Sequence, residues 1–128
     1  LTNDSGFLFE GEYNGLSEII GDGIVCRRTI RYSKKSKTLE VRDFITGFGN
    51  HSIKSFLHFM PDFVPAKKEE VIIMSREETE IMVKPEKNLP EIKITDYSPY
   101  FGVKLSRPSL VFITKKELPC EIGYSIHF

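Results

Sequence analysis

The chain has 128 residues, and 18 lysines and arginines balance 18 aspartates and glutamates, so its formal net charge is zero. This length suits one domain, and the lack of a basic excess argues against nucleic acid and membrane surfaces as partners. A composition of 40% hydrophobic residues is too apolar for a disordered chain. We expect a single domain over residues 1–128, and the start at Leu1 in place of Met indicates a cut, either by processing or out of a longer chain.

Apolar and polar residues alternate with a period of two along most of the chain, and the helical period is nearly missing. Turn residues separate these segments, as at 21–23 and 47–50. The predicted strands, in chain order, are 7–13, 24–33, 38–46, 52–60, 70–74, 79–84, 91–95, 100–106, 110–114 and 120–128. About ten short strands with this spacing predict an all-β fold, an antiparallel β-sandwich.

One hairpin can be predicted residue by residue. If Ser33 pairs with Thr38, antiparallel pairing places Arg28 directly opposite Asp43 on the apolar face. An arginine keeps its charge and needs a partner when it is buried. We therefore predict a structural ion pair, and removal of one partner should cost about 3–5 kcal/mol. The alternative is a polar pocket that binds a carboxylate or sulfate of a ligand.

Two cysteines and three histidines are the main candidates for chemistry. Cys26 and Cys120 lie far apart in the sequence, so a single long-range disulfide stays open. The alternation places Cys26 inward, which favours a buried, inert thiol over a nucleophile. His51 and His58 fall on opposite faces of one straight strand, so they do not converge on a metal, and His58 is predicted to be structural. We expect no catalytic residue, no metal site and no cofactor.

The most ligand-like aromatic residue is Tyr13, which is followed by Asn14 and a glycine. A tyrosine in such a setting can stack on a sugar and form a hydrogen bond with it. Arg27 and His51 complete the candidate substrate-binding residues. The alternative for Tyr13 is packing over a turn at the end of a strand.

Four segments in chain order resemble the heparinase II/III-like polysaccharide lyases. They are EYNGL at 12–16, VCRRTI at 25–30, TLEVRDFITGFG at 38–49 and FLHFMP at 56–61. Together they are similar to the later part of the β-sheet domain of that family. The sequence departs from the family pattern at Cys26, where a histidine is expected, and at Asn14, where an aspartate is usual.

The resemblance implies a bacterial, periplasmic or secreted parent enzyme with an α/α-toroid followed by antiparallel β-sheet layers. Such enzymes cleave acidic polysaccharides by β-elimination next to a uronate, in which a base removes the C5 proton and an acid assists the leaving oxygen. The catalytic tyrosine and histidine and the metal-site signature belong to earlier segments, and none of them aligns with this chain.

The sequence therefore favours a non-catalytic carboxy-terminal β-sandwich that packs against a missing toroid, where it can line one side of the saccharide cleft. As an isolated piece, it should show an apolar patch, which a homodimer can cover. A stand-alone carbohydrate-binding or protein-interaction module is the second hypothesis. A small enzyme that uses His51 or His58 is the third.

Overall fold

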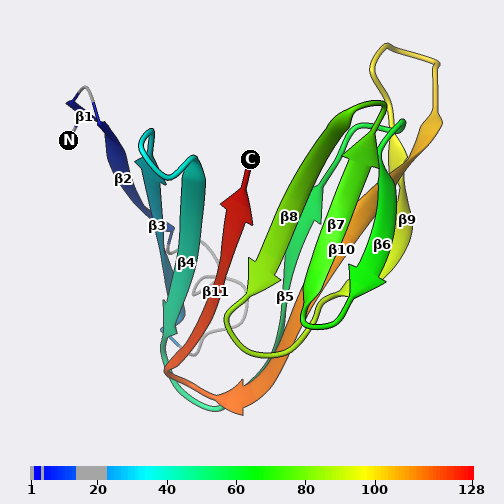
Figure 1. The fold of residues 1–128 in the computed structure, drawn as a ribbon. Helices are drawn as coiled ribbons and strands as arrows, with labels where there is room; N and C mark the ends of the chain where they lie inside the picture. The colour runs from blue at the N-terminus through cyan, green and yellow to red at the C-terminus, as the bar shows by residue number, and fades with distance from the viewer. Residues whose placement is uncertain (1, 4, 14–22) are drawn as a thin grey trace.

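Two antiparallel sheets make up the computed structural model, which describes residues 2–3, 5–13 and 23–128 (Figure 1). The larger sheet has the order β1-β2-β3-β4-β11-β8-β7-β6, and the smaller has the order β5-β10-β9. The strands are β1 Thr2–Asn3, β2 Gly6–Tyr13, β3 Val25–Ser33, β4 Thr38–Thr46, β5 Asn50–His58, β6 Val64–Lys68, β7 Val71–Arg76, β8 Thr79–Pro85, β9 Glu91–Tyr97, β10 Leu105–Glu117 and β11 Cys120–His127. The predicted all-β antiparallel sandwich is confirmed. Within the described residues, no helix could cross a membrane.

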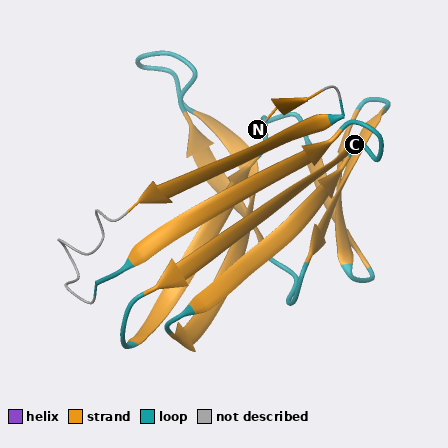
Figure 2. Ribbon diagram, turned by 90° about the vertical axis from the view of Figure 1, so that its left-hand side faces the viewer, coloured by secondary structure: helices purple, strands orange, loops and turns teal. Residues whose placement is uncertain are grey.

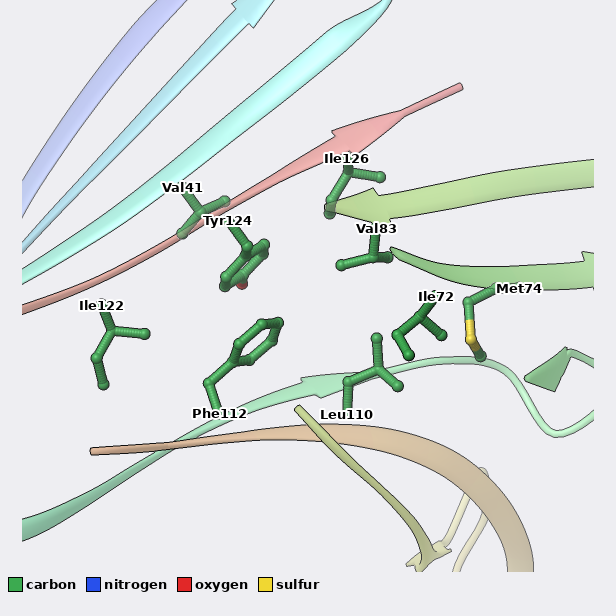
Figure 3. Close-up of a cluster of buried hydrophobic side chains, with 9 residues drawn as sticks. All are labelled: Val41, Ile72, Met74, Val83, Leu110, Phe112, Ile122, Tyr124 and Ile126. Carbon is green, nitrogen blue, oxygen red and sulfur yellow. The ribbon is translucent and has the colours of Figure 1, made fainter. Parts of the chain in front are cut away.

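The smaller sheet packs against one part of the larger sheet, and the main hydrophobic core lies between them (Figure 3). Leu110 and Phe112 of β10 face side chains from β4, β11, β8 and β7. The rings of Phe112 and Tyr124 are stacked, with centroids 4.5 Å apart. We call this cluster the covered core; its members are Val41, Ile72, Met74, Val83, Leu110, Phe112, Ile122, Tyr124 and Ile126.

The side of the larger sheet that carries the covered core continues onto β2 and β3, where it extends past the edge of the smaller sheet. Figure 1 shows these two strands at the left of the molecule, away from β5, β10 and β9, and Figure 2 shows the strands turned by 90°. We call this surface the uncovered face; it consists of the inner-side aromatic residues Phe7, Phe9 and Tyr13 of β2 and Tyr32 of β3. Phe9 is 53% exposed and Tyr13 is 58% exposed. The alternation continues here, but among the described residues no second layer covers these aromatic rings.

The pairing of β3 with β4 has the register that the sequence predicts. Ser33 pairs with Thr38, and Arg28 pairs with Asp43. Side chains of directly opposed residues lie on the same face, so the register places the two charged groups together. The hairpin register is thus confirmed.

Two predictions of strand position are wrong. Residues 100–106 were expected to form a strand, but the amide of Val103 donates to the carbonyl of Tyr100 in a turn, and β10 begins at Leu105. Strand β6 falls in a segment without a predicted strand, because its proline and two lysines interrupt the alternation of apolar and polar residues. It pairs with β7 at the edge of the larger sheet, where charged residues and proline are tolerated.

Candidate functional site at the open side of the sandwich

An ion pair between β3 and β4 occupies the inner side of the larger sheet. Nε of Arg28 donates to Oδ1 of Asp43 at 2.6 Å, and Nη2 donates to Oδ2 at 2.7 Å. This bidentate geometry is the strong form of an arginine–carboxylate contact. The side chain of Asp43 is buried, whereas that of Arg28 is 42% exposed. The hydrogen bond from Arg28 to Asp43 raises the pKa of Arg28, so the guanidinium stays charged.

A serine from the smaller sheet completes this ion-pair site. The hydroxyl of Ser55, on β5, donates to Oδ2 of Asp43 at 3.5 Å. The three groups therefore connect β3, β4 and β5, and the contact joins the two sheets. Ser55 was missed in the sequence, although it stands between the inward residues Ile53 and Leu57 in the alternation of β5. A polar residue in such a position signals an inward hydrogen bond.

Beside the ion pair lies a cleft of about 280 Å³. Its lining is largely apolar and includes Ile24, Cys26 and Phe56. Because Arg28 already binds Asp43 through two hydrogen bonds, the positive charge at the cleft is largely compensated. The arrangement is suited to holding the sheets together, and less suited to capturing an anion.

Neither cysteine has the character of a nucleophile. Burial raises the pKa of Cys26 and of Cys120, so both thiols are held in the protonated form. Cys26 and Cys120 both pair with Ile45, from opposite sides of β4. Strand β4 separates the two thiols, and both cysteines are free.

The structure separates the predicted substrate-binding residues. Tyr13 lies on the uncovered face opposite Cys26. Arg27 points to the other face of the same sheet, where its Nη2 donates to Glu12 at 3.2 Å. His51 is the second residue of β5, and its Nε2 lies 2.9 Å from the carbonyl oxygen of Phe48. Asn14 lies outside the described residues.

Tyr13 and Arg27 cannot contribute to one sugar-binding site, because their side chains lie on opposite faces of the larger sheet. A saccharide-binding role for any of the predicted residues stays a prediction. No group of three histidine, cysteine, aspartate or glutamate side chains within the described residues is arranged to hold a metal ion.

Comparison with protein-family models gives no match, and comparison with curated proteins gives none. Solved structures do match. A mutant of the heparan sulfate lyase HepC from Pedobacter heparinus has a TM-score of 0.80 and 13% identity over 99% of this chain and 20% of its own. A heparinase III with methylated lysines has a TM-score of 0.76 and 13% identity over 98% of this chain and 20% of its own.

The chain shares its fold with a region of these lyases. Another structure of HepC matches 81% of this chain with 16% identity and a TM-score of 0.68. The chain spans about 20% of the length of the first two matched structures. At this identity the match shows the fold, and the fold is the one that the sequence resemblance implies.

Proposed function

We propose that this chain is the non-catalytic, carboxy-terminal β-sandwich of a heparinase II/III-like polysaccharide lyase. The parent enzyme would cleave a uronate-containing acidic polysaccharide by β-elimination, with the catalytic groups on an amino-terminal α/α-toroid. The observation that carries the proposal is the structural match, which covers 99% of this chain and only 20% of the lyase chain.

The uncovered face supports this proposal. Phe7, Phe9 and Tyr13 alternate toward the same side as the covered core, yet all three are exposed. Adjacent exposed aromatic residues are unusual on a free surface and typically mark a contact with another part of a protein. In the proposed parent enzyme, this face packs against polypeptide that this chain does not include.

The charged groups next to that face support a structural role. Arg28 and Asp43 satisfy each other, and Ser55 adds a contact from the second sheet. A general base for elimination needs a titratable group that can reach a substrate proton. At this site the titratable groups are engaged in the ion pair or protonated, so the site supports architecture rather than proton transfer.

The proposal is tested by substituting one exposed aromatic residue in two contexts. Phe9→Asp should leave the melting temperature of the 128-residue chain nearly unchanged, because Phe9 is already 53% exposed. In the protein expressed from the complete reading frame, the same change should lower the melting temperature and the soluble yield, because it places a charge in a packed contact. Thermal unfolding of both proteins measures the difference.

Phe44→Asp is the matched control. Phe44 is 43% exposed, and its pairing with Arg27 places it on the other face of the larger sheet. This variant should have the same small effect in both contexts. Equal behaviour of the Phe9 and Phe44 variants in the complete protein would contradict the proposal, as would unsaturated-uronate formation by the 128-residue chain alone.

A further inference from the structure

The side of the smaller sheet that faces away from the core carries a connected row of polar side chains. His58 Nδ1 lies 2.6 Å from the hydroxyl oxygen of Ser109, and that oxygen lies 2.7 Å from the hydroxyl oxygen of Thr95. Nε of Arg107 donates to Thr95 at 3.4 Å. The row crosses all three strands, from β5 through β10 to β9. Ser109 at its centre is fully buried, although it lies on the outer side of the sheet.

The chemistry of these groups allows one continuous series of donors and acceptors along the row. Arginine can only donate, so Thr95 accepts from Arg107. A hydroxyl group can both donate and accept, so the row is satisfied when Thr95 donates to Ser109 and Ser109 donates to Nδ1 of His58. In this arrangement every hydroxyl hydrogen has an acceptor, and His58 carries its proton on Nε2. The ends of the row therefore offer N–H donors to an incoming ligand, from His58 and from the rest of the Arg107 guanidinium.

Aromatic rings flank both ends of the row. The ring of Phe56, which is exposed, is stacked with that of His58 at a centroid distance of 5.7 Å. At the other end, the guanidinium of Arg107 lies over the ring of Tyr97, with its central carbon 5.2 Å from the centroid. These contacts hold the donors in defined orientations, which lowers the entropy that binding would cost.

The same surface is basic, although the whole chain is neutral. The strand pairing shows which described residues of β5, β9 and β10 point to the outer side, and these include four basic and two acidic side chains. They are Lys54, Lys93, Arg107 and Lys115 against Glu91 and Glu117. Lys93 is paired with Glu91 at 3.4 Å. The residual positive charge is spread along the three strands of this side, which suits an extended anionic chain.

We propose that the outer side of the smaller sheet binds an acidic oligosaccharide, with Arg107 and His58 donating to its carboxylate or sulfate oxygens. The exposed ring of Phe56 provides an apolar plane for a sugar ring. The saccharide class rests on the proposed function, whereas the donor row and the basic excess do not. The polar row lies on the smaller sheet and the uncovered face on the larger sheet, although Phe56 also lines the cleft beside Arg28.

The experiment is a calorimetric titration of the 128-residue chain with a heparin-derived hexasaccharide and with neutral maltohexaose. The sulfated probe should bind and the neutral probe should not. Arg107→Gln should weaken binding at least tenfold, and Phe56→Ala should weaken it several-fold. Circular dichroism spectra of each variant establish that the fold is retained.

Arg27→Gln is the matched control, because Arg27 is an exposed arginine on the outer side of the larger sheet. It should leave the affinity within about twofold. Lys54→Gln is a second test, and because Lys54 is exposed, this substitution should not unfold the protein. It should weaken binding several-fold.

Two results would overturn the inference: no binding of the sulfated probe, or equal losses in the Arg107 and Arg27 variants. The latter shows diffuse charge attraction without a site. Because the proposed function is tested through Phe9 on the larger sheet, either result can occur while the packing of the uncovered face still holds. The two proposals can therefore fail separately.

Discussion

The larger-sheet residues of the covered core and those of the uncovered face lie on the same side of one sheet, yet they differ sharply in exposure. Ile72 and Val83 of the covered core are fully buried, whereas Phe9 and Tyr13 on the uncovered face are more than half exposed. The difference comes from the smaller sheet, in which β10 lies over β4, β11, β8 and β7 but not over β2. Alternation therefore identifies the apolar side of a strand, and only the second layer determines whether that side is buried.

The largest expected effect comes from matched truncations in the two regions. Phe112→Ala removes a ring that stacks on Tyr124 within the core, and it should lower the free energy of unfolding by about 3–5 kcal/mol. Phe9→Ala in the isolated chain should cost about 1 kcal/mol or less, because much of the ring is already in water. Equilibrium urea unfolding measures both values, and similar losses would contradict the comparison.

The ion pair lies between the two regions and should show an intermediate effect. Asp43→Ala strands the charge of Arg28, but the Arg28 side chain is 42% exposed and can be hydrated. We expect a loss of about 1–3 kcal/mol in the free energy of unfolding, less than for a fully buried pair. Ser55→Ala is the companion variant and should cost less, since its contact is long. If Asp43→Ala left the free energy of unfolding almost unchanged, the ion pair would not contribute to stability.

Two glycines, Gly6 in β2 and Gly123 in β11, allow the two regions to be compared through the space beside the backbone. A Cβ on Gly6 would meet the carbonyl oxygen of Tyr32, which is fixed in β3. Gly6→Ala should therefore displace β2 and cost roughly 1–2 kcal/mol. A Cβ on Gly123 would clash with the carboxylate end of the Glu86 side chain, which can rotate away. Gly123→Ala should cost less than about 1 kcal/mol, and thermal unfolding of the pair gives the order.

The smallest expected effect concerns the pH dependence of His58. Burial and the nearby charge of Arg107 lower the pKa of His58 below its ordinary value of 6.5. As the pH falls through 6.5, the unfolded chain takes up a proton before the folded chain does. Stability should therefore decrease slightly on acidification, and it should be unaffected by this group at higher pH. An NMR titration should give a pKa below 6.5 for His58 and a higher value in Arg107→Gln.

Local patterns were sufficient for several parts of the fold. The strand pattern and the register of the β3–β4 hairpin follow from the sequence, because a short loop joins two neighbouring strands and antiparallel pairing fixes every later pair. That register also places Arg28 opposite Asp43. The turn at Tyr100 and the edge strand β6 were missed because alternation is weak there and the pairing partner decides.

The candidate sites depended more on contacts that are distant in the sequence. Ser55 reaches Asp43 from another sheet, and Ser109 joins His58 to Thr95 across three strands. His58 was predicted to be structural, but its partners were beyond prediction because β10 lies about fifty residues further along the chain. Tyr13 and Arg27 were both predicted to bind substrate, and the strand pairing places them on opposite faces.

The sequence by itself determined the all-β class, most strand positions and the pairing within one hairpin, since these depend on local alternation and short connections. The tertiary structure decided which apolar residues are buried. It inserted β11 between β4 and β8 and placed β10 over only part of the larger sheet. These arrangements arise from contacts between residues far apart in the chain, where burial of apolar surface is shared among several strands and no local pattern records it.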